Sequence, residues 1–145
     1  RATSAGWLCL RFVFRFYSWL TWVLTTAVPM ALRRSTISVL RRIALGTAVV
    51  STQVLQEYYV NAIRKLHLPA DVAREKVEIL ASLPVVQVDP PLILAAVDLH
   101  QRHQLSFWDA LIVQAAVVGG CRELLTEDLQ HGATIAGVRV VDPFR

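Results

Sequence analysis

From Gly46 onward the chain alternates short runs of β-branched residues with longer amphipathic segments, and this alternation constrains its fold more than any other feature. Short β-branched runs bounded by turn residues are typical of buried strands, whereas the longer segments have helical spacing. Strands that alternate with helices pair in a mostly parallel sheet, because each helix returns the chain to the same end of that sheet. The sequence therefore predicts an α/β fold. The expected strands cover residues 48–51, 85–88, 123–126 and 138–141.

Proline, glycine and serine mark where the expected helices begin and end. The first helix covers 52–65, and the second covers 70–82, after Pro69. Two prolines at 90 and 91 suit a first helical turn and open a helix to about residue 103. Ser106 is expected to cap the next helix, which stops at the glycine pair 119–120. The apolar face of the first helix is expected to consist of Leu55, Tyr59, Ala62 and Leu66.

The N-terminal third differs from the rest in composition. Residues 1–46 contain seven arginines and no acid, whereas the other 99 residues contain eight Lys/Arg and eleven Asp/Glu, a net charge of −3. The basic character of the whole chain is therefore local, and it is only a weak argument for a nucleic-acid partner. The uncharged run 16–32 fits three interpretations: a membrane or signal segment, a buried part of the domain, or an aberrant N-terminus.

Length and cysteine content limit the remaining possibilities. A chain of 145 residues with 54% hydrophobic and 18% charged residues is long enough for one ordered domain. Its two cysteines have no metal-ligand spacing, which indicates a reducing compartment. The sequence lacks a nucleophile elbow, a P-loop and a dinucleotide fingerprint, so these enzyme classes lose their usual support.

Three acids, Glu57, Asp109 and Asp128, are candidates for a cation site. Asp109 shares a helical stripe with the apolar Ile112 and Val113, where a carboxylate needs a cap, a cation or a metal. Asp128 follows an expected strand, at the sheet edge where such folds bind ligands. Mg²⁺ and Mn²⁺ prefer oxygen ligands, and a metal-bound water can hydrolyse a phosphodiester.

Each acid also has a structural interpretation. Asp109 has capping-box spacing from Ser106, Glu57 fits a solvated helix face, and Asp128 fits an ordinary turn. The histidines at 100 and 103 are expected to be structural or solvated, and His131 is expected to have a turn role rather than to contact substrate. The case for a metal site therefore depends on the three acids lying together.

Four segments closely resemble PIN-domain proteins, above all the VapC-like toxins of toxin–antitoxin pairs. They are STQVLQEYY (51–59), LSFWDALIVQAA (105–116), LLTEDLQHG (124–132) and GVRVVDPF (137–144). The resemblance implies an α/β/α sandwich around a mostly parallel sheet and a Mg²⁺- or Mn²⁺-dependent endoribonuclease. It also implies that Glu57, Asp109 and Asp128 are catalytic metal ligands, with Thr126 in a supporting role.

The chain departs from the family pattern at its N-terminus. PIN domains normally begin with an apolar strand that ends in a metal-binding aspartate, yet this sequence has no acid before Glu57. The corresponding region, 12–24, is apolar but lacks the acid. We therefore divide the chain into an atypical segment, 1–45, and a PIN-like domain, 46–145. Our hypothesis for the first segment is a shifted reading frame or a degraded gene, and impaired activity is the expected consequence of the missing acid.

The resemblance also implies partners and a compartment. A toxin of this kind cleaves RNA in the cytoplasm, is neutralised by a cognate antitoxin protein and commonly forms a homodimer. The alternative is a catalytically inactive PIN-like binding module that pairs with an antitoxin or with itself. A membrane-tethered or exported protein conflicts with the cytosolic role of the family, so a membrane partner is not expected.

Overall fold

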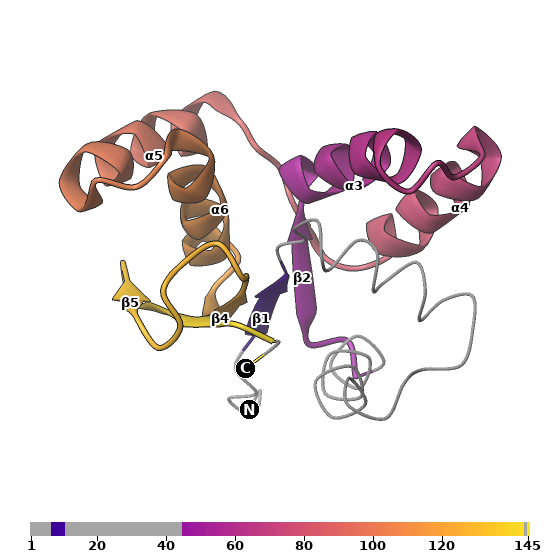
Figure 1. Cartoon of the computed structure of the whole chain (residues 1–145). Coiled ribbons are helices and arrows are strands. Elements are labelled where there is room, and N and C mark those ends of the chain that lie inside the picture. Colours follow the sequence, from indigo (N-terminus) through magenta and orange to yellow (C-terminus); the bar gives the residue numbers. More distant parts are fainter. Residues whose placement is uncertain (1–6, 11–44, 144) are drawn as a thin grey trace.

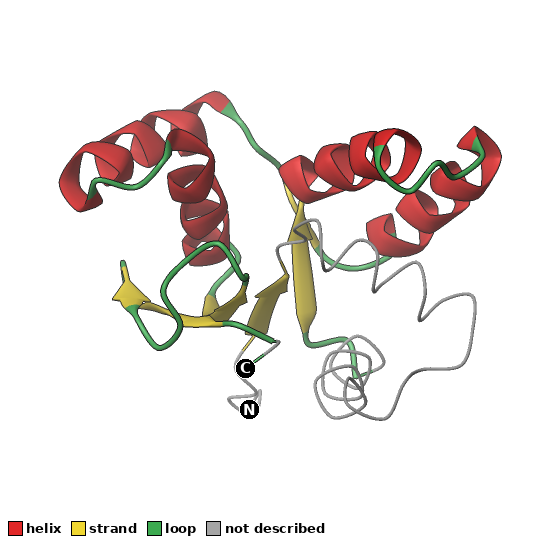
Figure 2. Cartoon of the chain, in the orientation of Figure 1, coloured by secondary structure: helices red, strands yellow, loops and turns green. Residues whose placement is uncertain are grey.

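The computed structural model describes residues 7–10, 45–143 and 145. Helices and strands alternate along the part from residue 48 onward (Figure 2). The strands in the described ranges are β1 (Trp7–Leu10), β2 (Ala48–Ser51), β3 (Val85–Val86), β4 (Cys121–Leu125), β5 (Thr134–Ile135) and β6 (Val138–Val141). The helices in those ranges are α3 (Thr52–Arg64), α4 (Ala70–Ala81), α5 (Pro90–His103) and α6 (Phe107–Val118).

The described strands form one sheet in the order β3-β2-β1-β4-β6-β5. Every neighbouring pair is parallel except β5 and β6, which pair antiparallel. The predicted α/β fold with a mostly parallel sheet is therefore confirmed. The position of β1 between β2 and β4 was not predicted, because we expected the first strand within 12–24, which lies outside the described residues.

Side-chain caps fix the starts of three helices. The Ser51 hydroxyl accepts a hydrogen bond from the Val54 N–H, and Ser106 caps α6 as the sequence predicted. Asp89 caps α5 by accepting from the Leu92 N–H at 2.9 Å, directly before the two prolines of the first turn. Such caps satisfy N–H groups that have no partner inside the helix. Local sequence therefore decides where these helices begin.

The helices lie in two pairs around the sheet. Figure 1 shows α5 and α6 on one side of β1 and β2, and α3 and α4 on the other. Helix α6 contacts α5, β2, β4 and β6, and half of its residues are buried. One main core joins both helix pairs to the strands, and its largest fully buried side chains include Tyr58, Ile112 and Leu124. The same core therefore packs against both α3 and α6.

The buried face of α3 is rotated from the predicted one. Val54, Tyr58 and Ala62 are buried, while Tyr59 is 42% exposed, so the prediction for Tyr59 is wrong. A spacing of four residues keeps Val54, Tyr58 and Ala62 on one stripe, whereas Tyr59 lies about 100° further round the helix. With two adjacent tyrosines, the sequence pattern fits either stripe, and packing against the sheet selects Tyr58.

Strand β5 was also absent from the sequence prediction. It pairs Ile135 with Val138 across the two residues Ala136 and Gly137, which have φ values of 49° and 83°. Positive φ at both central residues is typical of the tightest hairpin turns. A strand of two residues is too short to show an alternating pattern, which explains why the sequence did not reveal it.

The apolar run 16–32 lies outside the described residues. Within the ranges that the structure does describe, no helix is long and apolar enough to span a bilayer.

Candidate metal centre

The carboxyl ends of the parallel strands lie side by side at one edge of the sheet. Leu10 of β1 is in register with Leu125 of β4, which in turn pairs with Val141 of β6. Strand β2 runs parallel to β1 and ends at Ser51, from which α3 begins. The first turn of α3 and the loop after β4 therefore emerge at the same edge, which is where open α/β sheets bind ligands.

Glu57 lies in the second turn of α3 and is partly buried. Its carboxylate oxygen Oε1 accepts a hydrogen bond of 2.7 Å from Nε2 of Gln53, one turn earlier in the helix. Hydrogen bonds between side chains four residues apart are common on helices, so this contact fits both the site interpretation and the helix-face interpretation.

Asp109 lies in the first turn of α6 and forms a reciprocal cap with Ser106. The Asp109 N–H donates to Ser106 Oγ at 3.1 Å, and the Ser106 hydroxyl donates to Asp109 Oδ2 at 2.6 Å. Ile112 and Val113 on the same stripe are fully buried, while Asp109 is half-buried at the helix end. The capping interpretation is thus confirmed, and the hydroxyl and the helix N-terminus both stabilise the carboxylate.

One side chain links these two acids. Besides its bond to Glu57, Gln53 Nε2 lies 3.4 Å from the backbone oxygen of Trp108, the residue before Asp109. The Glu57 carboxylate therefore lies within two hydrogen-bond lengths of the first turn of α6. Sequence reasoning missed Gln53, although its spacing of four residues from Glu57 on one helix was an available signal.

Asp128 is exposed in the loop after β4. Its N–H donates to Thr126 Oγ1 at 3.2 Å, and Thr126 itself is 1% exposed and bonded through its N–H to the Val141 carbonyl. The buried threonine thus fixes the backbone of the loop that carries the acid. This is a turn role for the Asp128 backbone, while its side chain stays at the surface.

The three predicted acids do not gather into one cluster. Within the described ranges, no group of three or more His, Cys, Asp or Glu side chains is arranged to hold a metal ion. Mg²⁺ commonly binds through one or two carboxylates while waters and substrate phosphates fill the other positions. Gln53 links Glu57 to the first turn of α6, which carries Asp109. Glu57, Asp109 and Asp128 remain predicted ligands.

Two of the histidines, His131 and His100, bond to backbone groups of neighbouring loops, while His103 is exposed. His131 Nδ1 accepts from the Asp142 N–H at 3.0 Å, and His100 Nδ1 bonds to the backbone oxygen of Leu105. Both contacts tie neighbouring loops together. Neither ring is therefore required for a metal site.

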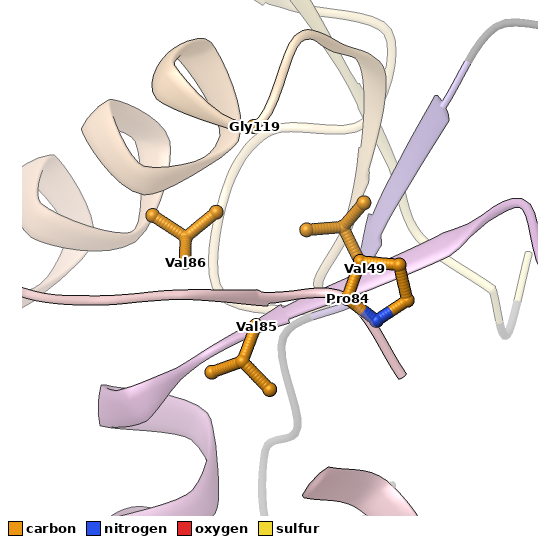
Figure 3. Close-up of a pocket in the computed structure, with 5 residues that line it drawn as sticks. All are labelled: Val49, Pro84, Val85, Val86 and Gly119. Atoms are coloured by element: carbon orange, nitrogen blue, oxygen red, sulfur yellow. The ribbon is translucent and has the colours of Figure 1, made fainter. Parts of the chain in front are cut away.

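A hollow of about 140 Å³ elsewhere on the domain is lined only by apolar side chains and a glycine (Figure 3). Val49 of β2, Pro84, Val85 and Val86 line it together with Gly119, directly after α6. Asp109 lies at the opposite end of the same helix, roughly 15 Å away along its axis. This hollow lacks the charged groups that hydrolysis needs, so we assign no catalytic role to it.

Comparison with known proteins agrees with this geometry. The sequence model of the PIN domain matches residues 27–134, about three quarters of the chain. The chain belongs to the PIN-domain family. PIN domains are in general nucleases, a class of hydrolases, and they typically use divalent metals.

A solved structure has the same fold as this PIN domain. It is described as a toxin-antitoxin complex from Klebsiella pneumoniae. The chain of that complex is 21% identical, with a TM-score of 0.60, and the match covers 94% of the present chain and 97% of that chain. At this identity the likeness concerns the fold. No curated protein matched the chain.

Proposed function

We propose that this PIN domain is a metal-dependent endoribonuclease and the toxin of a toxin–antitoxin pair. The observation that carries the proposal is the link through Gln53, which brings the Glu57 carboxylate to the first turn of α6 beside Asp109. Two carboxylates on separate helices at the carboxyl edge of a parallel sheet suit a divalent cation and a phosphodiester substrate. The toxin–antitoxin context of the Klebsiella pneumoniae structure supports the biological role.

The proposed ligands of Mg²⁺ or Mn²⁺ are Glu57, Asp109 and Asp128. The bound metal would activate water and offset charge on the phosphate. The chain itself contributes orientation: Gln53 donates to Glu57, and Ser106 donates to Asp109. These second contacts restrict where each carboxylate can point, which is how outer partners tune metal sites in general.

The proposed partners are RNA, a cognate antitoxin protein and a second copy of the chain. The part from residue 47 onward is net negative, so long-range attraction by this part does not explain RNA binding. Recognition would instead depend on local contacts between phosphate and metal. We expect the protein to act in the cytoplasm, where its RNA substrate would be.

A second candidate function is that of a catalytically inactive binding module that pairs with an antitoxin or with itself. The observation that favours it is the composition of β1, the central strand, which is Trp-Leu-Cys-Leu and precedes Arg11 in the sequence. No Asp or Glu precedes Glu57, so this strand supplies no carboxylate to the edge. A site with fewer acids would bind metal more weakly and cleave more slowly.

The test is cleavage of single-stranded RNA by the full chain with Mg²⁺, with Mn²⁺ and with EDTA. We expect cleavage that EDTA abolishes and that the substitution Asp109→Asn reduces at least 10-fold. The matched control is Asp98→Asn, because Asp98 is an exposed acid on α5. That variant should cleave like the wild type.

Equal cleavage by wild type and Asp109→Asn would exclude the proposed site. Complete absence of metal-dependent cleavage by the folded wild type would favour the binding module. In that case, a stable complex with an antitoxin would be the expected positive finding.

A further inference from the structure

Gln53 has an unusual position for a polar side chain. It is 3% exposed, in the first turn of α3, and it contacts both the Glu57 carboxylate and the Trp108 carbonyl. Trp108 is 55 residues away in the sequence, so this one amide joins the two halves of the proposed site. The amide nitrogen has two protons, one for each of these acceptors.

The two acceptors fix the orientation of the amide. An ionised carboxylate and a backbone carbonyl accept hydrogen bonds but cannot donate them, so the NH₂ group must face both. The amide oxygen Oε1 consequently points away from them. It is buried and has no hydrogen-bond partner among the residues that the structure describes.

A buried carbonyl oxygen without a partner destabilises the folded state. A methionine of similar length would remove this oxygen, but it would also remove the donors to Glu57 and to the Trp108 carbonyl. The advantage of glutamine at this position therefore lies in these two donors. One donor bonds to the Glu57 side chain on α3, and the other bonds to the backbone of α6 at Trp108. These two helices carry the proposed metal ligands Glu57 and Asp109.

We propose that Gln53 is a positioning residue that holds the Glu57 carboxylate against the first turn of α6, next to Asp109. This inference rests on the proposed function, because it concerns the metal ligands of that site. Glu57 can rotate about three side-chain bonds, and a donor from the preceding turn restricts that rotation. The same amide anchors the first turn of α6, so the two carboxylates keep one relative placement. A site with few ligands depends most on such placement, because each carboxylate contributes a large share of the binding.

The test is the substitution Gln53→Met in the full chain, with two measurements. The first is the midpoint of urea unfolding, which we expect to change little, since removal of the unpartnered oxygen offsets the loss of the two donors. The second is Mn²⁺ affinity, followed by electron paramagnetic resonance of the free ion. We expect this affinity to fall about 10-fold or more. If Gln53 had only a structural role, the substitution would lower the stability of the fold, and metal affinity would change only as a result of unfolding.

Two further variants sharpen the test. Gln56→Met changes an exposed glutamine of the same helix and should bind Mn²⁺ like the wild type. Glu57→Gln should itself weaken binding, and adding Gln53→Met to it should weaken binding no further, because the carboxylate that Gln53 positions is already gone.

The outcomes separate the two proposals. If the wild type and Gln53→Met bind Mn²⁺ with equal affinity, Gln53 does not position the site, and the proposed function stands. A fall in Mn²⁺ affinity that appears only where Gln53→Met is partly unfolded also refutes the positioning role, because it would show a purely structural one. A folded wild type that binds no Mn²⁺ would overturn the proposed function together with this role.

Discussion

Removing the Ser106 hydroxyl tests whether the contact between Ser106 and Asp109 only stabilises α6 or also supports RNA cleavage. In Ser106→Ala, the Asp109 N–H loses its acceptor at 3.1 Å, and Asp109 Oδ2 loses its donor at 2.6 Å. Loss of a serine N-cap costs about 1 kcal/mol. The second bond is solvent-accessible, so it adds only a few tenths of a kcal/mol. For a chain of this size, the Tm should fall by roughly 3–5 °C.

Cleavage should respond more strongly than stability. Without the hydroxyl, the Asp109 carboxylate loses a contact that orients it, and we expect metal-dependent RNA cleavage to fall about 10-fold. The matched control is Asp89→Ala. This substitution removes the side chain that caps α5 by accepting from the Leu92 N–H, and it leaves α3 and α6, which carry Glu57 and Asp109, unchanged. It should lower the Tm by a similar amount without changing cleavage. Ser106→Thr keeps a hydroxyl and should restore both properties.

Two results would refute this reasoning. If Ser106→Ala and Asp89→Ala cleave equally well at a temperature where both are folded, Ser106 is a cap and nothing more. If Ser106→Ala unfolds at the wild-type temperature, the reciprocal cap does not stabilise α6. Thermal unfolding by circular dichroism and cleavage of a labelled RNA measure the two properties on the same samples.

Two other predictions concern buried side chains. Tyr58→Ala should destabilise the fold by about 3–5 kcal/mol in urea unfolding, because Tyr58 is fully buried, whereas Tyr59→Ala should cost less than about 1 kcal/mol; the reverse order would mean that the sequence-predicted face of α3 was right. Thr126→Val removes the acceptor of the Asp128 N–H, so it should lower stability by about 1–2 kcal/mol and also reduce cleavage. Cleavage that is unaffected by Thr126→Val would contradict a role for the Asp128 loop in the site.

Some features of the fold follow from short stretches of sequence. The starts of α5 and α6 were predictable because the Asp89 and Ser106 caps bond to N–H groups three residues later. Prolines and β-branched runs act over equally short distances, so the alternation of strands and helices was predictable too. The identity of the buried tyrosine in α3 was not predictable, because it depends on the surface against which the helix packs.

The candidate site divides in the same way. From the sequence, Glu57, Asp109 and Asp128 were predicted as metal ligands. The spacing of three residues between Ser106 and Asp109 also predicted their capping contact. It did not reveal that Gln53 contacts Trp108, because those residues are 55 positions apart and meet only when α3 and α6 pack on the same sheet. It also did not place β1 between β2 and β4, since pairing of parallel strands depends on long-range contacts. Hydrogen bonds within one turn of a helix depend on residues that are close in the sequence, so the sequence alone determines them. Contacts between elements arise only from the tertiary packing of the whole domain.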